Sequence, residues 1–136
     1  MKPLLLSLLL LIVPALPAAA QDWALGGFDA VAYARAGHPV PGRSDIVTMW
    51  KGKLWHFASE DNRARFEADP RAYAPGFNGL CPVSLSEGRR EKGDPRHFII
   101  LDRKLYLLRS ESAERQMRAA PKDVLSQAKR IWGKIR

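Results

Sequence analysis

A β-hairpin followed by a helix is predicted twice in this chain, and this recurrence constrains the fold more than any other feature. In the first copy, residues 46–50 are rich in β-branched and aromatic side chains, residues 51–53 form a turn, and residues 54–57 return as a second strand. Ser59 is a favourable helix N-cap with acidic residues directly after it, so we expect a helix from residue 60 to about residue 68.

The second copy lies 51 residues further along the chain. Strands are predicted over residues 97–101 and 105–108, and Ser110 is placed to cap a helix that starts at Glu111. The 51-residue shift superposes six identical pairs: Lys53/Lys104, Leu54/Leu105, Ser59/Ser110, Glu60/Glu111, Ala68/Ala119 and Pro70/Pro121. Chance, or the residue preferences common to any hairpin followed by a helix, would also produce such a match. Either way, the pattern predicts a small single α+β domain of two antiparallel β-hairpin–helix units packed on one core.

A longer helix is predicted at the C-terminus, starting at Pro121, because proline is favoured in the first turn. Apolar residues recur there at helical spacing: Val124, Leu125, Ala128, Ile131, Trp132 and Ile135. The basic residues are largely elsewhere on the helical wheel: Lys122, Lys129, Arg130, Lys134 and Arg136. The helix could dock on the core with a solvated basic face, or lie on an anionic membrane surface.

The first 20 residues have the pattern of a cleaved secretory signal. Lys2 precedes an apolar run over residues 4–13, and small residues at 18–20 suit signal peptidase. A membrane anchor is the alternative, but the run is short and contains prolines nearby. We therefore expect cleavage after Ala20, a mature domain of residues 21–136, and a periplasmic or secreted location.

Charge and cysteine content narrow the possible partners. The chain has 22 basic and 14 acidic residues, a formal net charge of +8, and this favours acidic proteins, polyanions or lipid headgroups as partners. Nucleic acid is not expected, because export would keep the protein away from it. The single cysteine excludes an intramolecular disulfide, so packing must hold the fold together.

Two shorter elements are also expected. Residues 28–33 could form a short helix capped by Asp29, or an irregular turn. Further on, Pro82 suits the first position of a helix and Gly88 suits its end, which places Cys81 at the N-cap.

The predicted N-cap position makes Cys81 the main candidate for chemistry. Unpaired backbone N–H groups and the helix dipole favour the thiolate there, which is the form that attacks electrophiles and binds metals. The alternative is that Cys81 is a small buried hydrophobic residue, as free cysteines often are. A Cys-x-x-Cys metal or redox site within one chain is excluded, because there is only one cysteine.

His56 is the candidate second ligand. It alternates with Trp55 and Phe57, so it faces the opposite side of its strand, where it could meet Cys81 or lie on the surface. A thiolate with one histidine would form a soft, two- or three-coordinate site suited to Cu(I) or another soft metal ion. No glycine-rich phosphate loop or serine nucleophile elbow is present, so we do not expect an enzyme.

Several blocks of the chain resemble one known family. They are Gly26–Tyr33, Trp50-x-Gly52, Trp55-x-Phe57-Ala58-Ser59, Asn62, Phe66-x-Ala68-Asp69-Pro70, Tyr73-Ala74-Pro75, Gly79-x-Cys81, Gly93-Asp94-Pro95 and Asp102-x-Lys104-Leu105-Tyr106-Leu107. Over about residues 25–133, the chain resembles exported YHS-domain proteins. The resemblance implies a small α+β domain related to proteins of heavy-metal handling, some of which occur beside copper-transporting ATPases. The usual metal cysteines of those relatives are absent here, and Cys81 matches the cysteine of the exported subgroup.

Two functional hypotheses follow. The first is an exported binding module that holds a soft metal ion such as copper through Cys81, with His56 as a second ligand. The second is an envelope interaction protein without enzymatic activity, which docks an acidic protein partner or an anionic membrane surface through its basic face. A thiol enzyme is the most distant alternative, since it would need an acidic thiol at Cys81 and a base within hydrogen-bond reach.

Overall fold

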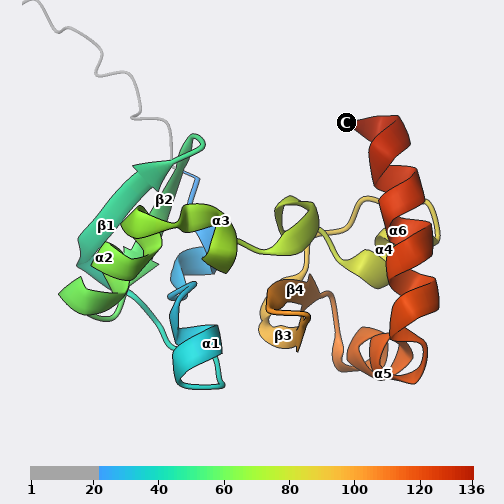
Figure 1. Cartoon of the computed structure of the whole chain (residues 1–136), viewed down its shortest axis with the longest axis horizontal. Coiled ribbons are helices and arrows are strands. Elements are labelled where there is room, and N and C mark those ends of the chain that lie inside the picture. The colour runs from blue at the N-terminus through green and yellow to red at the C-terminus, as the bar shows by residue number, and fades with distance from the viewer. Residues whose placement is uncertain (1–21) are drawn as a thin grey trace, which may run out of the picture.

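The computed structural model describes residues 22–136, and Figure 1 shows them as two hairpin–helix units side by side. The predicted signal sequence, residues 1–20, lies outside the described residues. Within residues 22–136, no helix has both the length and the apolar character that a membrane crossing needs.

The elements of the first unit are, in chain order, a 3₁₀ turn η1 (Ala24–Gly27), α1 (Ala32–Arg35), β1 (Arg43–Trp50), β2 (Lys53–Phe57), α2 (Glu60–Ala68) and α3 (Pro70–Tyr73). Those of the second unit are η2 (Gly76–Gly79), α4 (Pro82–Ser86), β3 (Asp94–Leu101), β4 (Lys104–Leu108), α5 (Glu111–Ala119) and α6 (Pro121–Ile135). Each unit contains one antiparallel two-stranded sheet. The predicted α+β class, with two hairpin–helix units and a C-terminal helix, is confirmed.

The two units repeat each other residue by residue at the predicted spacing. With a shift of 51, the bounds of β1, β2 and α2 coincide with those of β3, β4 and α5. Both helices are capped in the same way, because Ser59 accepts a hydrogen bond from the backbone N of Asn62 and Ser110 accepts one from Ala113, each at 3.1 Å. Each capping bond satisfies a backbone donor that the first helical turn would otherwise leave unpaired.

The segments before the hairpins repeat as well: the 3₁₀ turns η1 and η2 are related by a shift of 52 residues, and the residues directly before β1 and β3 by a shift of 51. An isolated antiparallel bridge joins Phe28 to Pro41 in the first unit and Leu80 to Lys92 in the second. Directly after these bridges come Gly42 and Gly93. A Cβ atom on Gly42 would lie 2.5 Å from the backbone C of His56, and one on Gly93 would lie 2.4 Å from the Cβ of Leu107. Both positions therefore require glycine.

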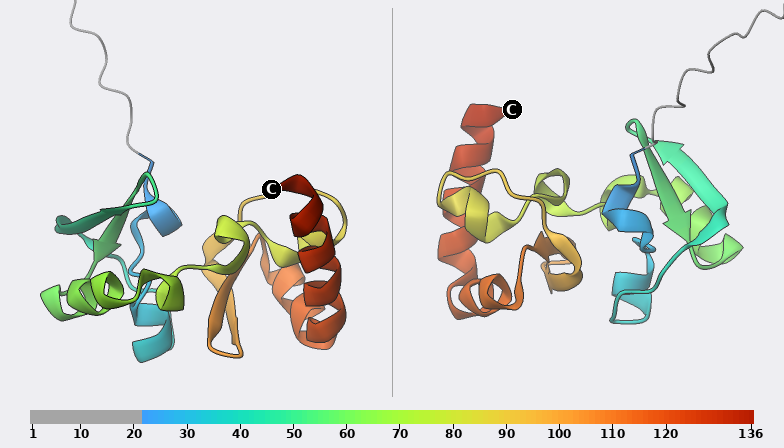
Figure 2. Two further views of the ribbon diagram at one scale, coloured as in Figure 1. Left: turned by 45° about the horizontal axis from the view of Figure 1, so that its top comes forward. Right: turned by 180° about the vertical axis from the view of Figure 1, so that it is seen from behind.

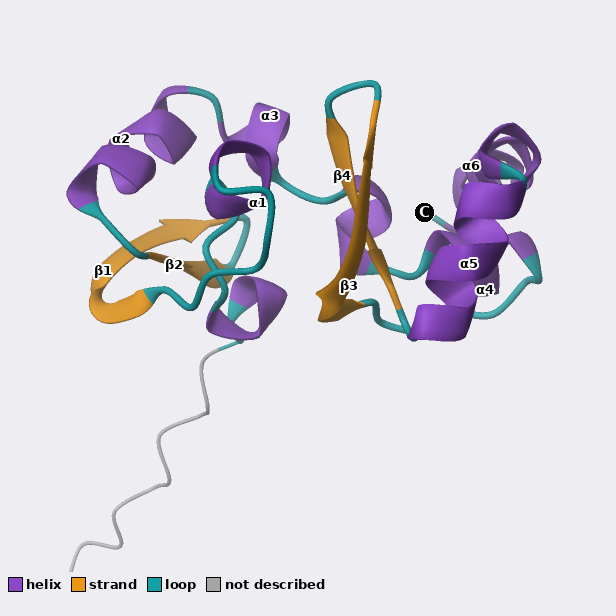
Figure 3. Cartoon of the chain, turned by 90° about the horizontal axis from the view of Figure 1, so that it is seen from below, coloured by secondary structure: helices purple, strands orange, loops and turns teal. Residues whose placement is uncertain are grey.

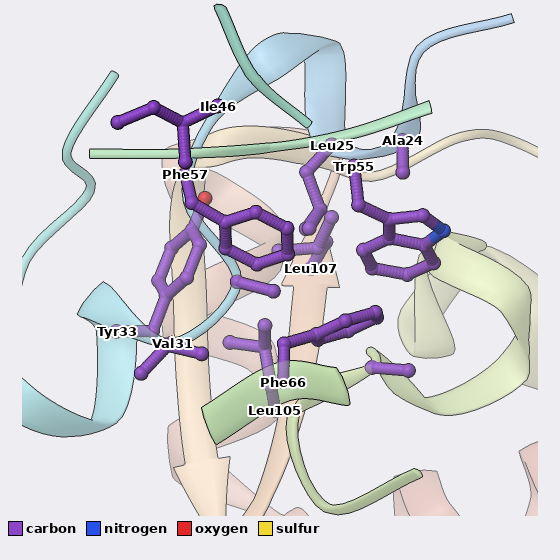
Figure 4. Close-up of a cluster of buried hydrophobic side chains, with 12 residues drawn as sticks. Ala24, Leu25, Val31, Tyr33, Ile46, Trp55, Phe57, Phe66, Leu105 and Leu107 are labelled. Carbon is purple, nitrogen blue, oxygen red and sulfur yellow. The ribbon is translucent and has the colours of Figure 1, made fainter. Parts of the chain in front are cut away.

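The buried side chains form two clusters that share β4, where the sequence predicted one core. The first cluster is built mainly from the first unit but also contains Leu105 and Leu107 of β4, which Figure 4 shows beneath Phe57 and Phe66. The second cluster contains Tyr106 and Leu108. Since successive side chains of a strand point to opposite faces, β4 fills both clusters at once. Figure 3 shows the β3–β4 hairpin between the first unit and helices α5 and α6.

A side-chain hydrogen bond also joins the two units. The Tyr33 hydroxyl donates to the backbone carbonyl of Pro95 at 2.7 Å, and the ring of Tyr33 packs edge-on against Phe98 with 5.0 Å between centroids. Burial raises the pKa of Tyr33, and the nearby carboxylates of Asp94 and Asp29 raise it further. The hydroxyl therefore stays a donor throughout the physiological pH range.

The C-terminal helix α6 uses its apolar stripe inside the molecule. Val124 and Leu125 pack against the second cluster, and Ala128 is fully buried. The helix lies along α4, and Lys122 and Lys129 face solvent. The first half of the apolar stripe of α6 is thus occupied by the core, whereas Ile131, Trp132 and Ile135 belong to neither buried cluster.

A buried carboxylate organises the start of the first unit. The short helix predicted over 28–33 is observed as α1, shifted to residues 32–35. Asp29 has no solvent exposure, and its Oδ1 accepts hydrogen bonds from the backbone N atoms of Val31 at 2.8 Å and Ala32 at 3.2 Å. Its Oδ2 accepts from the backbone N of Ala58 and the side-chain amide of Asn62, both at 2.8 Å. One carboxylate thereby joins α1 to the start of α2.

We predict that Asp29→Ala destabilises the domain by roughly 3–5 kcal/mol, because several buried donors lose their charged acceptor together. The free energy of unfolding, measured by urea denaturation, tests this. Asp45→Ala is the matched control, since Asp45 pairs with Arg43 on the surface and its removal should leave the free energy of unfolding close to that of the unchanged protein. Equal effects of the two substitutions would show that the Asp29 network does not organise the fold.

Candidate functional site

Cys81 is the N-cap residue of α4, as the sequence predicted, but its side chain is fully buried. Its backbone N donates to the carbonyl of Glu91 at 2.8 Å, and its carbonyl accepts from the backbone N of Leu85 at 2.9 Å. Its side chain belongs to the second cluster, whose other buried members are Val83, Ile99, Tyr106, Leu108, Ala113 and Met117. The thiol is therefore surrounded by apolar side chains and has no solvent contact.

The repeat explains why a cysteine stands here. At the 52-residue shift, Cys81 takes the place of Asp29, whose backbone N likewise donates at 2.8 Å to the carbonyl of Val40. Asn62, the amide partner of Asp29, is replaced in the second unit by the buried Ala113. The polar network of the first unit has thus become an apolar contact, and Cys81 fills the space as a small hydrophobic residue.

His56 lies on β2 and is also buried, with 3% of its surface exposed. Its ring contacts Trp23, with 4.4 Å between the ring centroids, and its Nδ1 atom has no hydrogen-bond partner. The equivalent residue in the second unit is Leu107, which points into the first cluster. No third unit covers β2 in this way, so its outer face is closed by Trp23 and accommodates a histidine.

Cys81 lies in the second unit and His56 in the first, and the two residues contact different neighbours. Among residues 22–136, no group of three or more histidine, cysteine, aspartate or glutamate side chains is arranged to hold a metal ion. His97 lies beside Glu114, with 3.7 Å between its Nδ1 and Oε1, while His38 is exposed. These contacts do not test the two- or three-coordinate soft-metal site predicted at Cys81 and His56, which stays a prediction.

A groove of about 1040 Å³ lies between the two units. One wall comes from the β1–β2 hairpin and η1, and the other from the loop before β3 and the end of α6. Residues 74–80 run between them. Figures 1 and 2 show the hairpin and the C-terminal end of α6 on either side of this connection. We call this feature the inter-unit groove.

All four tryptophans of the chain line the inter-unit groove: Trp23, Trp50, Trp55 and Trp132. Trp23 is the most open, with 53% of its surface exposed. The indole N–H of Trp55 donates to the carbonyl of Trp50 at 3.0 Å, and the two rings pack edge-on at 5.5 Å. At the other wall, Trp132 packs edge-on against Phe77 at 6.0 Å. The groove therefore has aromatic surface at both ends.

The polar lining of the inter-unit groove is almost entirely basic. Its cations are Lys51, Lys53, Arg71, Arg90, Lys92, Lys104 and Arg136. The only carboxylate among the described lining residues is Asp22, and this one pairs with Lys53 at 3.7 Å. Arg90 donates to the backbone carbonyl of Ile135 at 3.2 Å, which holds its guanidinium near the end of α6. The groove is thus an electropositive concavity.

The gathering of cations in the groove has an electrostatic cost, which appears in the pKa of Lys104. Partial burial lowers the pKa of Lys104, and the positive charges of Lys51 and Arg71 lower it further. A folded-state pKa below the unfolded value means that the charged form opposes folding, and this penalty is relieved as pH rises through the lowered pKa. The sequence therefore keeps a cation where stability alone would favour a neutral residue.

Sequence reasoning did not identify this groove. Its cations come from the β1–β2 turn, α3, the loop before β3, β4 and the last residue, so no basic run interleaved with aromatics exists in the chain. The available signal was local, in the pairing of tryptophan with lysine at Trp50-Lys51 and at Lys53-x-Trp55. These short sequence segments come together in the inter-unit groove only when the chain is folded.

Comparisons with known proteins found no relative of this chain: no protein-family model, no curated protein and no solved structure matches it. The fold and the groove together define the molecule as a tandem hairpin–helix α+β domain with a basic, tryptophan-lined groove between its units.

For Cys81, we predict slow alkylation in the folded protein and fast alkylation in denaturant, because reagent can reach the thiol only after opening of the second cluster. The measurement follows modification of the chain's single cysteine over time, with glutathione as the freely exposed control thiol. We also expect Cys81→Ser to lower stability by roughly 1–3 kcal/mol, since it buries a hydroxyl among apolar side chains. Alkylation in buffer as fast as that of glutathione, with protection by Cu(I), would instead place a metal site at Cys81.

Proposed function

We propose that this protein is a binding module that docks an acidic segment of a partner protein in the inter-unit groove. The observation that carries the proposal is the convergence of all four tryptophans and seven cations on one concave surface that has a single, already paired carboxylate. Aromatic anchors surrounded by complementary charge are the usual composition of protein interaction sites. No covalent step is required, since the groove acts by charge and shape.

The shape of the groove favours a chain segment over a flat bilayer. A concavity of about 1040 Å³ is at the upper end of the size range of ligand pockets, and its basic groups face inward from two walls. Val124 and Leu125, which belong to the apolar stripe of α6, pack against the second cluster, and Ala128 is buried, so this part of the stripe does not face a membrane.

The packing of the aromatic rings favours amino-acid side chains over stacked bases. The Nζ atom of Lys51 lies 4.8 Å from the ring centroid of Trp50, and Trp55 and Phe66 pack against other parts of that ring. Single-stranded nucleic acid needs open aromatic faces on which successive bases can stack. Only Trp23 offers a largely exposed ring here, so an acidic peptide with one or two apolar side chains fits better.

The resemblance to exported YHS-domain proteins, the signal sequence, and soft-metal binding through Cys81 stay predictions. Among the residues that carry this resemblance, Asp29, Ser59 and Asn62 form the hydrogen-bonded cluster that joins α1 to α2. Those residues define a fold and not a ligand. If residues 1–20 direct export, the acidic partner is a protein of the cell envelope or the exterior.

The test uses a fluorescein-labelled dodecapeptide of aspartate and glutamate with one central leucine, followed by fluorescence anisotropy. We predict that Arg90→Gln/Lys92→Gln weakens binding by about two- to thirtyfold, as expected for two ion pairs of roughly 0.2–1 kcal/mol each. Affinity should also fall between 0.1 and 1 M NaCl, because the Debye length shortens from about 10 to about 3 Å.

Lys122→Gln/Lys129→Gln is the matched control, because it removes the same charge from the exposed face of α6. Equal loss in both double variants would mean that net charge, and not the groove, drives binding. Phosphatidylglycerol vesicles and a single-stranded oligonucleotide serve as competing probes. Preferential binding to vesicles that the α6 variant abolishes would favour the membrane alternative, and tighter binding to the oligonucleotide would overturn the choice of an acidic protein.

A further inference from the structure

Three cations converge within the inter-unit groove from three different elements. Lys51 comes from the β1–β2 turn, Arg71 from α3 and Lys104 from the start of β4, so both units contribute. The Nζ atom of Lys104 donates to the backbone carbonyl of Arg71 at 3.2 Å, which fixes the lysine beside α3. We call Lys51, Arg71 and Lys104 the three-cation cluster.

No carboxylate neutralises the cluster. Among residues 22–136, none of its three members takes part in an ion pair within 4.0 Å. The charges that act on Lys104 are those of Lys51 and Arg71, and both oppose its protonation. Like charges held together in a partly buried position are costly unless an anion joins them.

The repeat supplies an internal comparison. Lys104 corresponds to Lys53 at the 51-residue shift, and both residues begin the second strand of a hairpin. Lys53 has a carboxylate partner, because its Nζ lies 3.7 Å from Oδ2 of Asp22. Among the described residues, Lys104 has no such carboxylate partner, and the positive charges of Lys51 and Arg71 act on it instead. The same structural position has therefore been neutralised in one unit and left electropositive in the other.

We propose that the three-cation cluster is a subsite for a doubly charged oxyanion of the phosphate type. The inference rests on the proposed function, since it assigns the strongest anionic group of the groove's ligand to this position. The guanidinium of Arg71 offers paired planar donors, and the two ammonium groups add point charges. A single carboxylate would neutralise only one of the three cations, whereas a phosphoryl group carries close to two negative charges at neutral pH and three acceptor oxygens.

Trp50 gives the subsite a spectroscopic reporter. The ammonium of Lys51 lies over its ring at 4.8 Å, so an anion that draws Lys51 toward Arg71 must weaken this cation–π contact. Phosphate binding should therefore shift the indole N–H resonance of Trp50. The indole of Trp132, at the opposite wall of the groove, should shift less.

The experiment titrates inorganic phosphate, at constant ionic strength set with NaCl, into the protein while ¹⁵N-labelled indole resonances are recorded. We expect saturable shifts of Trp50, and about tenfold weaker binding for Lys104→Gln and for Arg71→Gln, since each loses one charge-assisted contact. Lys122→Gln is the control, because it removes a lysine from the exposed face of α6 outside the groove, and its affinity for phosphate should stay within about twofold of that of the unchanged protein. Two independent cluster variants keep the test valid if one of them folds poorly.

A second arm compares the acidic dodecapeptide with the same peptide carrying one phosphoserine, and the phosphopeptide should bind about tenfold more tightly only while the cluster is intact. Phosphate shifts no larger than those of chloride, or equal losses in Lys122→Gln and Lys104→Gln, would overturn the subsite. If the plain acidic peptide still bound in the groove, that failure would leave the proposed function standing. If phosphate bound while neither peptide did, the subsite would stand and the docking of an acidic segment would fail.

Discussion

The whole architecture depends on one strand that is buried on both faces. Leu105 and Leu107 of β4 fill the cluster of the first unit, while Tyr106 and Leu108 fill the cluster of the second. A two-stranded sheet alone is at best marginally stable in water, so each hairpin needs partners on its faces. By serving both clusters, β4 fixes the distance and angle between the units, and the inter-unit groove is the space that this packing leaves open.

Equivalent positions of the two units have diverged according to what surrounds them. Asp29 accepts four hydrogen bonds in the first unit, whereas Cys81 occupies its place among apolar side chains in the second. Leu107 must be apolar because it enters the neighbouring cluster, while His56 closes an outer face against Trp23. These exchanges follow from burial. Lys104 differs from its counterpart Lys53 in its surroundings and not in residue type, because Lys53 has a carboxylate partner whereas the charges acting on Lys104 are those of Lys51 and Arg71. A bound anion would offset the unfavourable charge at Lys104.

Local sequence patterns predicted the local structure well. The hairpins, the caps Ser59 and Ser110, the helix over residues 60–68 and the start of α6 at Pro121 are all observed. These features depend on strand periodicity, turn residues and capping, which act over a few residues. The short helix near Asp29 was placed too early, because the carboxylate caps from a position two residues further back than a regular N-cap. The division of the interior into two clusters depends on tertiary packing of β4 and had no local signal.

The site was much less predictable than the fold. The N-cap position of Cys81 was predicted correctly, but its burial depends on Ile99, Tyr106 and Met117, which are distant in sequence. The predicted alternation placed His56 opposite Trp55 and Phe57, yet it could not show that Trp23 covers that face. The groove combines residues from the whole described chain, and the net positive charge was its only trace in the composition.

A map of backbone amide and indole chemical shifts on addition of the acidic dodecapeptide tests whether the space between the units binds acidic ligands. We expect shifts along both walls together, with Trp23 and Trp50 in the first unit and Lys92 and Trp132 in the second. Shifts confined to the outer face of α6 or to α2, with the four indole resonances unchanged, would contradict this expectation.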